Sequence, residues 1–236
     1  MIMDRGISRR CFLGGIGSLA ACRAFAVPAG ALGGVPNLRI GVLSDIHIDA
    51  PQRDFRIFGD TRTFVKALEY FRSRDVDGVI IAGDMADRGM TYELKAVADA
   101  WFRVFPDDKA PDGRKVERLF VTGNHDWEGF NYGDFAKKHY PDETERMRYI
   151  LRHNLEKTWA DLFHEDYRPL YLKTVKGIPF VGAHWNPTKE RGHYGTAFLG
   201  LDEFLSANKG KFDPKLPLIY AQHPHPKDTC YGPWAW

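Results

Sequence analysis

Four short apolar segments of this sequence each end in a cluster of polar residues, and no other feature constrains the fold as much. The segments are residues 38–43, 78–82, 118–122 and 217–222. Their length and apolar content are typical of buried strands. In an open α/β sheet, ligand sites lie at the carboxyl ends of the strands. The four polar clusters are therefore expected to meet in the fold, although they are far apart in the sequence.

Segments with helical spacing stand between these strands. Residues 61–74 place their apolar side chains on one side, and residues 92–105 show the same period. Two further strands are expected at residues 170–175 and 179–183, joined at Gly177. A short helix is expected at residues 200–207. This alternation of strands and helices predicts an α/β fold with a mostly parallel sheet.

The polar clusters contain the residue types that bind divalent metals. They are Ser44-Asp45-Ile46-His47, Gly83-Asp84, Gly123-Asn124-His125-Asp126 and His223-Pro224-His225. Carboxylate, imidazole and amide oxygen together fit manganese, iron or zinc better than calcium, which prefers oxygen ligands alone. One aspartate that presents both oxygens can bridge two ions about 3.5–4 Å apart. Asp84 is the candidate bridge, because the glycine before it lets the chain turn sharply into the site.

Together, and in this order, these motifs resemble the calcineurin-like metallophosphoesterase superfamily. The resemblance implies a β-sandwich flanked by helices (αββα) and a site for two divalent metal ions, manganese, iron or zinc. It implies that Asp45, His47 and Asp84 bind one metal. The second metal would be bound by Asp84, Asn124 and His223.

The resemblance also assigns roles to residues that do not bind metal. His125 corresponds to a histidine that contacts the phosphate and protonates the leaving group, and Asp126 would orient it. Arg88 is a candidate phosphate contact, and the alternative interpretation is that it is a solvated surface charge. Purple acid phosphatases carry a tyrosine three residues after the bridging aspartate. Here that residue is Asp87, so no iron–tyrosinate site is expected.

The predicted function is hydrolysis of a phosphomonoester or phosphodiester by a water or hydroxide that bridges two metal ions. The alternative is an incomplete domain that binds phosphate ligands without turnover. The sequence does not select a substrate, because substrate choice depends on loops. We interpret the polar and aromatic residues 127–168 as a cap-like insertion, with a helical pattern over 143–163.

The superfamily normally completes its site with a Gly-His-x-His motif on a later strand, and two alignments are possible. In the favoured one, His223 is the single strand-end histidine and the motif lies beyond Trp236, so the domain is truncated. In the other, His184 is the single histidine and the pair is His223 and His225. Residues 200–205 favour the first alignment, because they resemble the short helix before the histidine-bearing strand.

The N-terminal residues predict export. The Arg9-Arg10 pair precedes an apolar stretch rich in glycine and alanine, and an A-x-A type cleavage site ends at Ala26. Residues 1–26 thus resemble a twin-arginine signal, which would be read by the export machinery and would lead to the periplasm. Cys22 lies in a lipoprotein-like box, so anchoring to the membrane through this cysteine is the alternative.

Removal of the signal changes the charge. The chain has 33 basic and 31 acidic residues, and residues 1–26 contain four arginines and one aspartate. Without them, 29 basic and 30 acidic residues remain. The formal charge falls from +2 to −1, which leaves no basic excess to predict nucleic-acid binding. We expect residues 27–36 to be a tether and residues 37–236 to be the metallophosphoesterase domain, with a phosphate ester as its partner.

Overall fold

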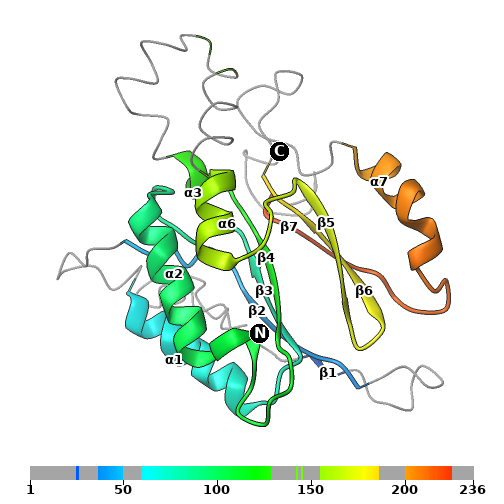
Figure 1. Ribbon diagram of the computed structural model, residues 1–236, viewed down its shortest axis with the longest axis horizontal. Helices are drawn as coiled ribbons and strands as arrows, with labels where there is room; N and C mark the ends of the chain where they lie inside the picture. Colours follow the sequence, from blue (N-terminus) through cyan, green and yellow to red (C-terminus); the bar gives the residue numbers. More distant parts are fainter. Residues whose placement is uncertain are drawn as a thin grey trace, which may run out of the picture.

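The computed structural model of the chain describes residues 25–26, 37–49, 60–128, 142, 145, 155–185 and 200–224. These residues form two small β-sheets that pack face to face, with helices outside them (Figure 1). The architecture is the mixed α/β sandwich that the sequence predicts.

The first sheet has the strand order β1-β2-β3-β4. Its parallel strands are β2 (Arg39–Leu43), β3 (Gly78–Ala82) and β4 (Glu117–Val121). The short strand β1 (Phe25–Ala26) pairs with β2 in the antiparallel direction. The prediction that residues 1–26 form an export signal stays a prediction. The rest of residues 1–36 lies outside the described residues.

Three helices cover the outer face of the first sheet: α1 (Thr61–Ser73), α2 (Thr91–Val104) and α6 (Lys157–Phe163). Helix α1 begins where the Asp60 side chain accepts a hydrogen bond from the Arg62 amide, which satisfies one of the open donors of the first turn. Each helix turns its apolar side toward the sheet, and the apolar core between them excludes water.

Part of the predicted cap belongs to this core. Leu155, Trp159, Phe163 and Tyr167 are buried in the cluster that α1 and α2 form against the sheet. The end of the predicted insertion is therefore integrated in the domain, because its aromatic side chains complete the helical layer. Most of residues 127–154 lie outside the described part of the chain.

The second sheet contains β5 (Leu170–Val175), β6 (Ile178–Ala183) and β7 (Ile219–Gln222) in that order. The hairpin between β5 and β6 turns at Lys176 and Gly177, which have φ values of 48° and 82°. Two positive φ values in a two-residue turn match the twist of a hairpin. Strand β7 pairs with β6 in the parallel direction.

A second apolar core lies between the two sheets. Its buried residues come from both, and include Ile80, Leu119, Val121, Ile178 and Phe180. Helix α7 (Leu201–Asn208) lies on the outer side of the second sheet and contains no buried residue. The first sheet therefore has a thick helical layer, and the described part of the second sheet has a thin one.

Three shorter helical elements complete the described fold: η2 (Pro106–Asp108), α3 (His125–Glu128) and η6 (Lys209–Lys211). Of these, α3 starts at the strand-end cluster after β4. No helix in the described part of the chain combines the length and apolar character needed to cross a membrane.

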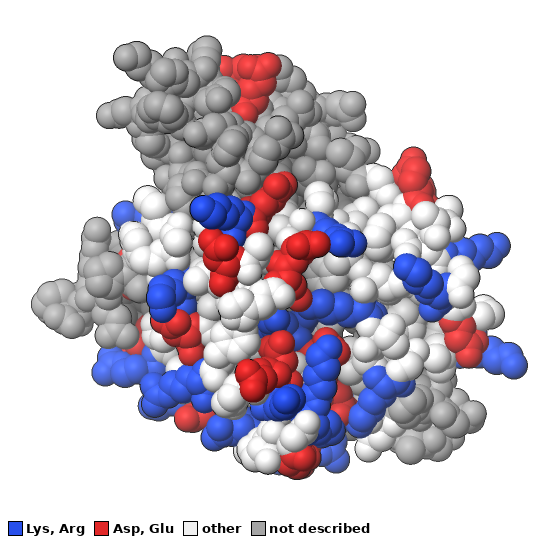
Figure 2. Space-filling view, in the orientation of Figure 1, with Lys and Arg blue, Asp and Glu red and all other residues white. Residues whose placement is uncertain are grey.

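Charged side chains of both signs are interspersed over the described part of the face in Figure 2. Several form close pairs on the surface, such as Lys95 with Asp99 at 2.6 Å and Arg168 with Asp166 at 3.1 Å. Exposed pairs of this kind contribute little to stability.

Candidate metal centre

The candidate site lies where the loops after β2 and β3 leave the first sheet. These loops stay paired beyond the strands: the Asp45 amide donates to the Gly83 carbonyl at 3.1 Å, and the His47 amide to the Asp84 carbonyl at 3.0 Å. The pairing continues to a bridge between Ile48 and the loop after β3. The backbone therefore places the first polar cluster beside the second.

Three residues of this site have an unusual backbone conformation. Asp45, His47 and Asp84 have φ values of 54°, 43° and 51°. Residues other than glycine rarely adopt positive φ, and each such residue costs on the order of 1–3 kcal/mol. This conformation persists where the surrounding structure enforces it, which occurs most often at functional sites.

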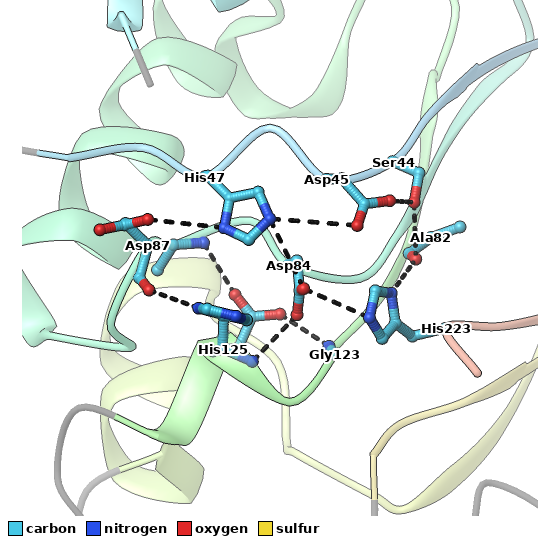
Figure 3. A network of polar contacts seen from close by, with 11 residues as sticks. Ser44, Asp45, His47, Ala82, Asp84, Asp87, Gly123, His125 and His223 are labelled. Carbon is cyan, nitrogen blue, oxygen red and sulfur yellow. Dashed lines mark hydrogen bonds and ion pairs between the residues drawn. The ribbon is translucent and has the colours of Figure 1, made fainter. Parts of the chain in front are cut away.

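One group of three side chains has the geometry of a metal-binding corner. Its donor atoms, from Asp45, His47 and Asp84, all lie within 4.8 Å of one another. His47 Nε2 is 4.0 Å from Asp45 Oδ1 and 3.6 Å from Asp84 Oδ2 (Figure 3). Asp84 is only 4% exposed, whereas the Asp45 side chain is open to solvent. Two carboxylates and one imidazole suit a divalent ion of manganese, iron or zinc.

His223 approaches Asp84 from the second sheet. Its Nε2 lies 3.3 Å from Asp84 Oδ2, and its Nδ1 lies 2.9 Å from the Ala82 carbonyl. The carbonyl holds a proton on Nδ1, so Nε2 is the nitrogen that a metal would bind, after displacing its proton. Asp84 Oδ1 also accepts the His125 amide at 2.9 Å, so this carboxylate contacts three polar clusters.

The charges of Asp84 and His223 stabilise each other. Burial lowers the pKa of His223, but the hydrogen bond and the charge of Asp84 outweigh it and raise this pKa to about 9. Burial raises the pKa of Asp84, but His223 and the His125 amide outweigh it, so this pKa is lowered. A carboxylate held ionised in a buried position suits a cation site.

Two glycines allow the clusters to approach so closely. A Cβ atom on Gly83 would collide with the His223 ring, and one on Gly123 would collide with Asp84 Oδ1. Gly83 also has a φ of 90°. A side chain at either position would separate the strand-end residues.

His125 lies beside the metal-binding corner. Its Nδ1 is 2.7 Å from the Asp87 carbonyl, and its ring packs edge-on against His47 at 4.7 Å between centroids. The carbonyl contact fixes Nδ1 as the donor, so Nε2 is the nitrogen that can exchange a proton with a substrate. Asp87 Oδ1 also lies 3.6 Å from His47 Nδ1. Sequence reasoning missed Asp87 as a site residue, although its position in a strand-end loop was a usable signal.

Asp126 accepts two backbone amides, and its predicted role in orienting His125 stays a prediction. Its two carboxylate oxygens accept the Ala86 and Gly123 amides, both at 2.8 Å, and it is fully buried. It ties the loop after β3 to the turn after β4, and the Asp87 carbonyl is the contact at His125 Nδ1. Burial raises the pKa of Asp126 to about 7, and the nearby Asp84 charge adds to the rise.

Two further predicted residues remain predictions. The Arg88 side chain is 46% exposed, and its Nε lies 3.6 Å from Asp87 Oδ2, at the rim of the site. A substrate phosphate would have to compete with that carboxylate. Asn124 lies in the turn between β4 and α3, next to the amide that Asp84 accepts.

The histidines of the two alignments are now separated in space. His223 lies beside Asp84, whereas His184 is buried elsewhere, with its Nδ1 accepting the Thr122 amide at 3.0 Å. His225 lies outside the described residues. Both alignments place His223 beside Asp84, so the choice between them and a motif beyond Trp236 stay predictions.

Comparison with known proteins gives the family. The family model of calcineurin-like phosphoesterases matches residues 38–234. A search of curated proteins found no match. Among solved structures, a dimetal phosphatase from Danio rerio is similar at 15% identity and a TM-score of 0.42, over 79% of this chain and 70% of that one. The family match covers most of the chain, including every residue of the candidate site. The chain therefore belongs to the calcineurin-like phosphoesterase family and is a metallophosphoesterase.

Proposed function

We propose that this protein hydrolyses phosphomonoesters or phosphodiesters at a centre of two divalent ions that share Asp84. One observation carries the proposal: Asp84 Oδ2 lies between two imidazoles, 3.6 Å from His47 Nε2 and 3.3 Å from His223 Nε2 (Figure 3). A buried carboxylate that faces a nitrogen ligand on either side fits a bridging role.

The residues present fit two ligand sets. Asp45, His47 and Asp84 would hold one ion, and Asp84, Asn124 and His223 the other. When bound, such ions neutralise the phosphate charge and lower the pKa of water toward neutrality, so that a nucleophile exists at ordinary pH. Manganese, iron and zinc all suit these donors.

The chain itself would bind the ester and supply a proton. Water releases a proton to the solvent and attacks phosphorus in line, and the bond to the leaving oxygen breaks as the new phosphorus–oxygen bond forms. His125 Nε2 donates its proton to that leaving oxygen, while the Asp87 carbonyl holds Nδ1. Arg88 would contact the substrate phosphate from the rim.

The test is metal-dependent hydrolysis of p-nitrophenyl phosphate and of its bis-ester. Protein freed of metal by a chelator should be inactive, and Mn²⁺ should restore turnover of one or both esters. Asp84→Asn should remove both the activity and the bound metal, because a neutral amide cannot balance two cations. Asp99→Asn, an exposed control, should behave like the wild type. Full activity of Asp84→Asn with normal metal content would disprove the shared bridge.

Export is a separate part of the proposal, supported by the sequence of residues 1–26. Arg9→Lys combined with Arg10→Lys should hold the protein in the cytoplasm, since the arginine pair is the recognised feature of this signal. Fractionation of cells that express either form measures the distribution. Unchanged export of the double variant would refute the twin-arginine interpretation. If Cys22 is instead lipidated, Cys22→Ser should release the protein from the membrane fraction.

A further inference from the structure

Strand β4 is the outer strand of the first sheet in the described part of the fold, so one of its edges has no neighbouring strand. Side chains of the second sheet satisfy that edge instead. Lys173 Nζ donates to the Arg118 carbonyl and the Tyr171 hydroxyl to the Phe120 carbonyl, both at 2.7 Å. The acceptors are two residues apart, as expected for one edge of a strand.

The last contact of this series falls on Thr122, directly before the metal-binding turn at residues 123–125. The Thr122 amide donates to His184 Nδ1 at 3.0 Å, and its carbonyl accepts the Trp185 amide at 3.1 Å. Its hydroxyl lies 3.1 Å from the Tyr167 hydroxyl. The amide, the carbonyl and the hydroxyl of Thr122 are thus all held from outside its own sheet.

The surroundings of His184 suit an acceptor that cannot be protonated easily. Its side chain is 2% exposed and is enclosed by the rings of Tyr167, Tyr171 and Trp159, at 4.4 to 5.3 Å between centroids. Burial, with a smaller contribution from the Lys173 charge, lowers the pKa of His184 to about 3. The neutral ring therefore offers Nδ1 as a fixed acceptor over the ordinary pH range.

We infer that His184 is a positioning residue that holds the metal-binding turn in place through the Thr122 amide. The turn that follows Thr122 contains Asn124 and presents the His125 amide to Asp84 Oδ1. A shift of Thr122 would displace both. The inference rests on the proposed function, because it assumes that this turn binds metal.

Two variants test the hydrogen-bond acceptor and the aromatic ring of His184 separately. His184→Phe keeps an aromatic ring but removes the acceptor. His184→Asn loses the ring but places its Oδ1 where Nδ1 was. Tyr171→Phe is the matched control, since it removes the hydrogen bond to the Phe120 carbonyl, two residues further from the turn. The affinity for Mn²⁺ is measured by titration calorimetry on folded protein, well below the midpoint of thermal unfolding.

All three variants should unfold at lower temperature than the wild type. The Mn²⁺ affinity of His184→Phe should fall about 10-fold, the lower end of the loss seen when the partners of metal ligands are removed. His184→Asn and Tyr171→Phe should bind Mn²⁺ within about 3-fold of the wild type, a difference of about 0.7 kcal/mol. Equal affinities of His184→Phe and Tyr171→Phe would overturn the inference, as would a loss in His184→Asn as large as that in His184→Phe. If His184→Phe does not fold, the test rests on His184→Asn. A 10-fold loss of Mn²⁺ affinity in His184→Asn would overturn the inference, and an affinity equal to that of the wild type would support it.

The wild type distinguishes this failure from a failure of the proposed function. If the wild type itself binds no Mn²⁺, the metal centre is wrong. If the wild type binds Mn²⁺ and the three variants bind it equally well, only the positioning role is wrong.

Discussion

His223 and His184 follow two neighbouring strands, yet they lie in opposite surroundings. Strands β7 and β6 pair in parallel, with Gln222 opposite Ala183, so the next residue on each is a histidine. His223 faces the Asp84 carboxylate, which raises its pKa to about 9. His184 lies among aromatic rings, and burial lowers its pKa to about 3. Equivalent positions in the second sheet therefore serve different purposes.

The first sheet determines this difference. Opposite His223 it presents two glycines, Gly83 and Gly123, which leave room for the ring to reach Asp84. Opposite His184 it presents Thr122, whose amide needs an acceptor. A strand-end histidine thus becomes a candidate ligand or a backbone acceptor according to the strand that it meets.

The largest expected effect tests whether the first sheet also supplies the proton donor. His125→Ala should lower turnover by on the order of 10²–10⁴ for an ester with a poor leaving group, the usual contribution of a general acid. Metal content should stay near that of the wild type, because the ring is placed outside both ligand sets. Steady-state rates with an alkyl phosphate measure the loss.

p-Nitrophenyl phosphate is the control for His125→Ala, because its leaving group needs little protonation. Its rate should fall much less. Equal losses for the two esters would argue against the acid role and for a binding role of His125.

The next largest effect tests the contrast between the two histidines directly. His223→Ala should weaken Mn²⁺ binding by at least about 10- to 100-fold, since loss of an outer partner alone has that cost. His184→Asn, which keeps the acceptor for Thr122, should bind Mn²⁺ like the wild type. Calorimetric titration of both proteins measures the difference. A loss in His184→Asn as large as that in His223→Ala would favour the second alignment, in which both histidines bind metal.

Acid titration sharpens the contrast. The native pKa of His184 is about 3 and its ordinary value is 6.5. Below pH 6.5, therefore, this residue binds a proton in the unfolded chain and stays neutral in the folded chain. The folded state should therefore lose about 1.4 kcal/mol of stability through this residue for each pH unit below 6.5, until about pH 3. His184→Asn should show a shallower decline of unfolding free energy between pH 6.5 and 5. Urea denaturation at several pH values measures it, and parallel curves would contradict it.

The element pattern was largely predictable from the sequence. Strand β3 and strand β5 have the expected bounds, and α1 and α2 differ from expectation by one residue. These segments have clear apolar periods, so local sequence suffices to define them. Residues 155–167 are harder to assign from sequence, because polar and aromatic residues in an insertion look alike whether they form a cap or join the core.

The site was predictable as a set of residues and less so as a set of contacts. The positions of Asp45, His47, Asp84 and His223 follow from strand ends that converge. The partner of His125 did not follow, because the contact is the backbone carbonyl of Asp87, and sequence patterns do not show carbonyl directions. The loop pairing that turns Asp126 toward two amides was hidden for the same reason.

The smallest expected effect concerns a carboxylate at the start of helix α2 that resembles His184 in its role. Glu93 is fully buried, and its Oε2 accepts the Arg88 and Met90 amides at 2.9 and 3.1 Å. Its Oε1 has no hydrogen-bond partner in the described part of the chain. Glu93 thus holds the loop after β3 as His184 holds the turn after β4.

Glu93→Gln should be close to neutral, because the amide oxygen can accept both donors. Burial raises the pKa of Glu93, so its charge costs the folded state stability at neutral pH, and the neutral amide removes that cost. The unfolding free energy should thus rise or change by less than about 0.5 kcal/mol. Glu93→Ala leaves two amides without their acceptor and should lower it by about 1–3 kcal/mol. Urea denaturation compares the three proteins. If Glu93→Gln is as destabilising as Glu93→Ala, the charge holds the loop, and the parallel with the neutral His184 fails.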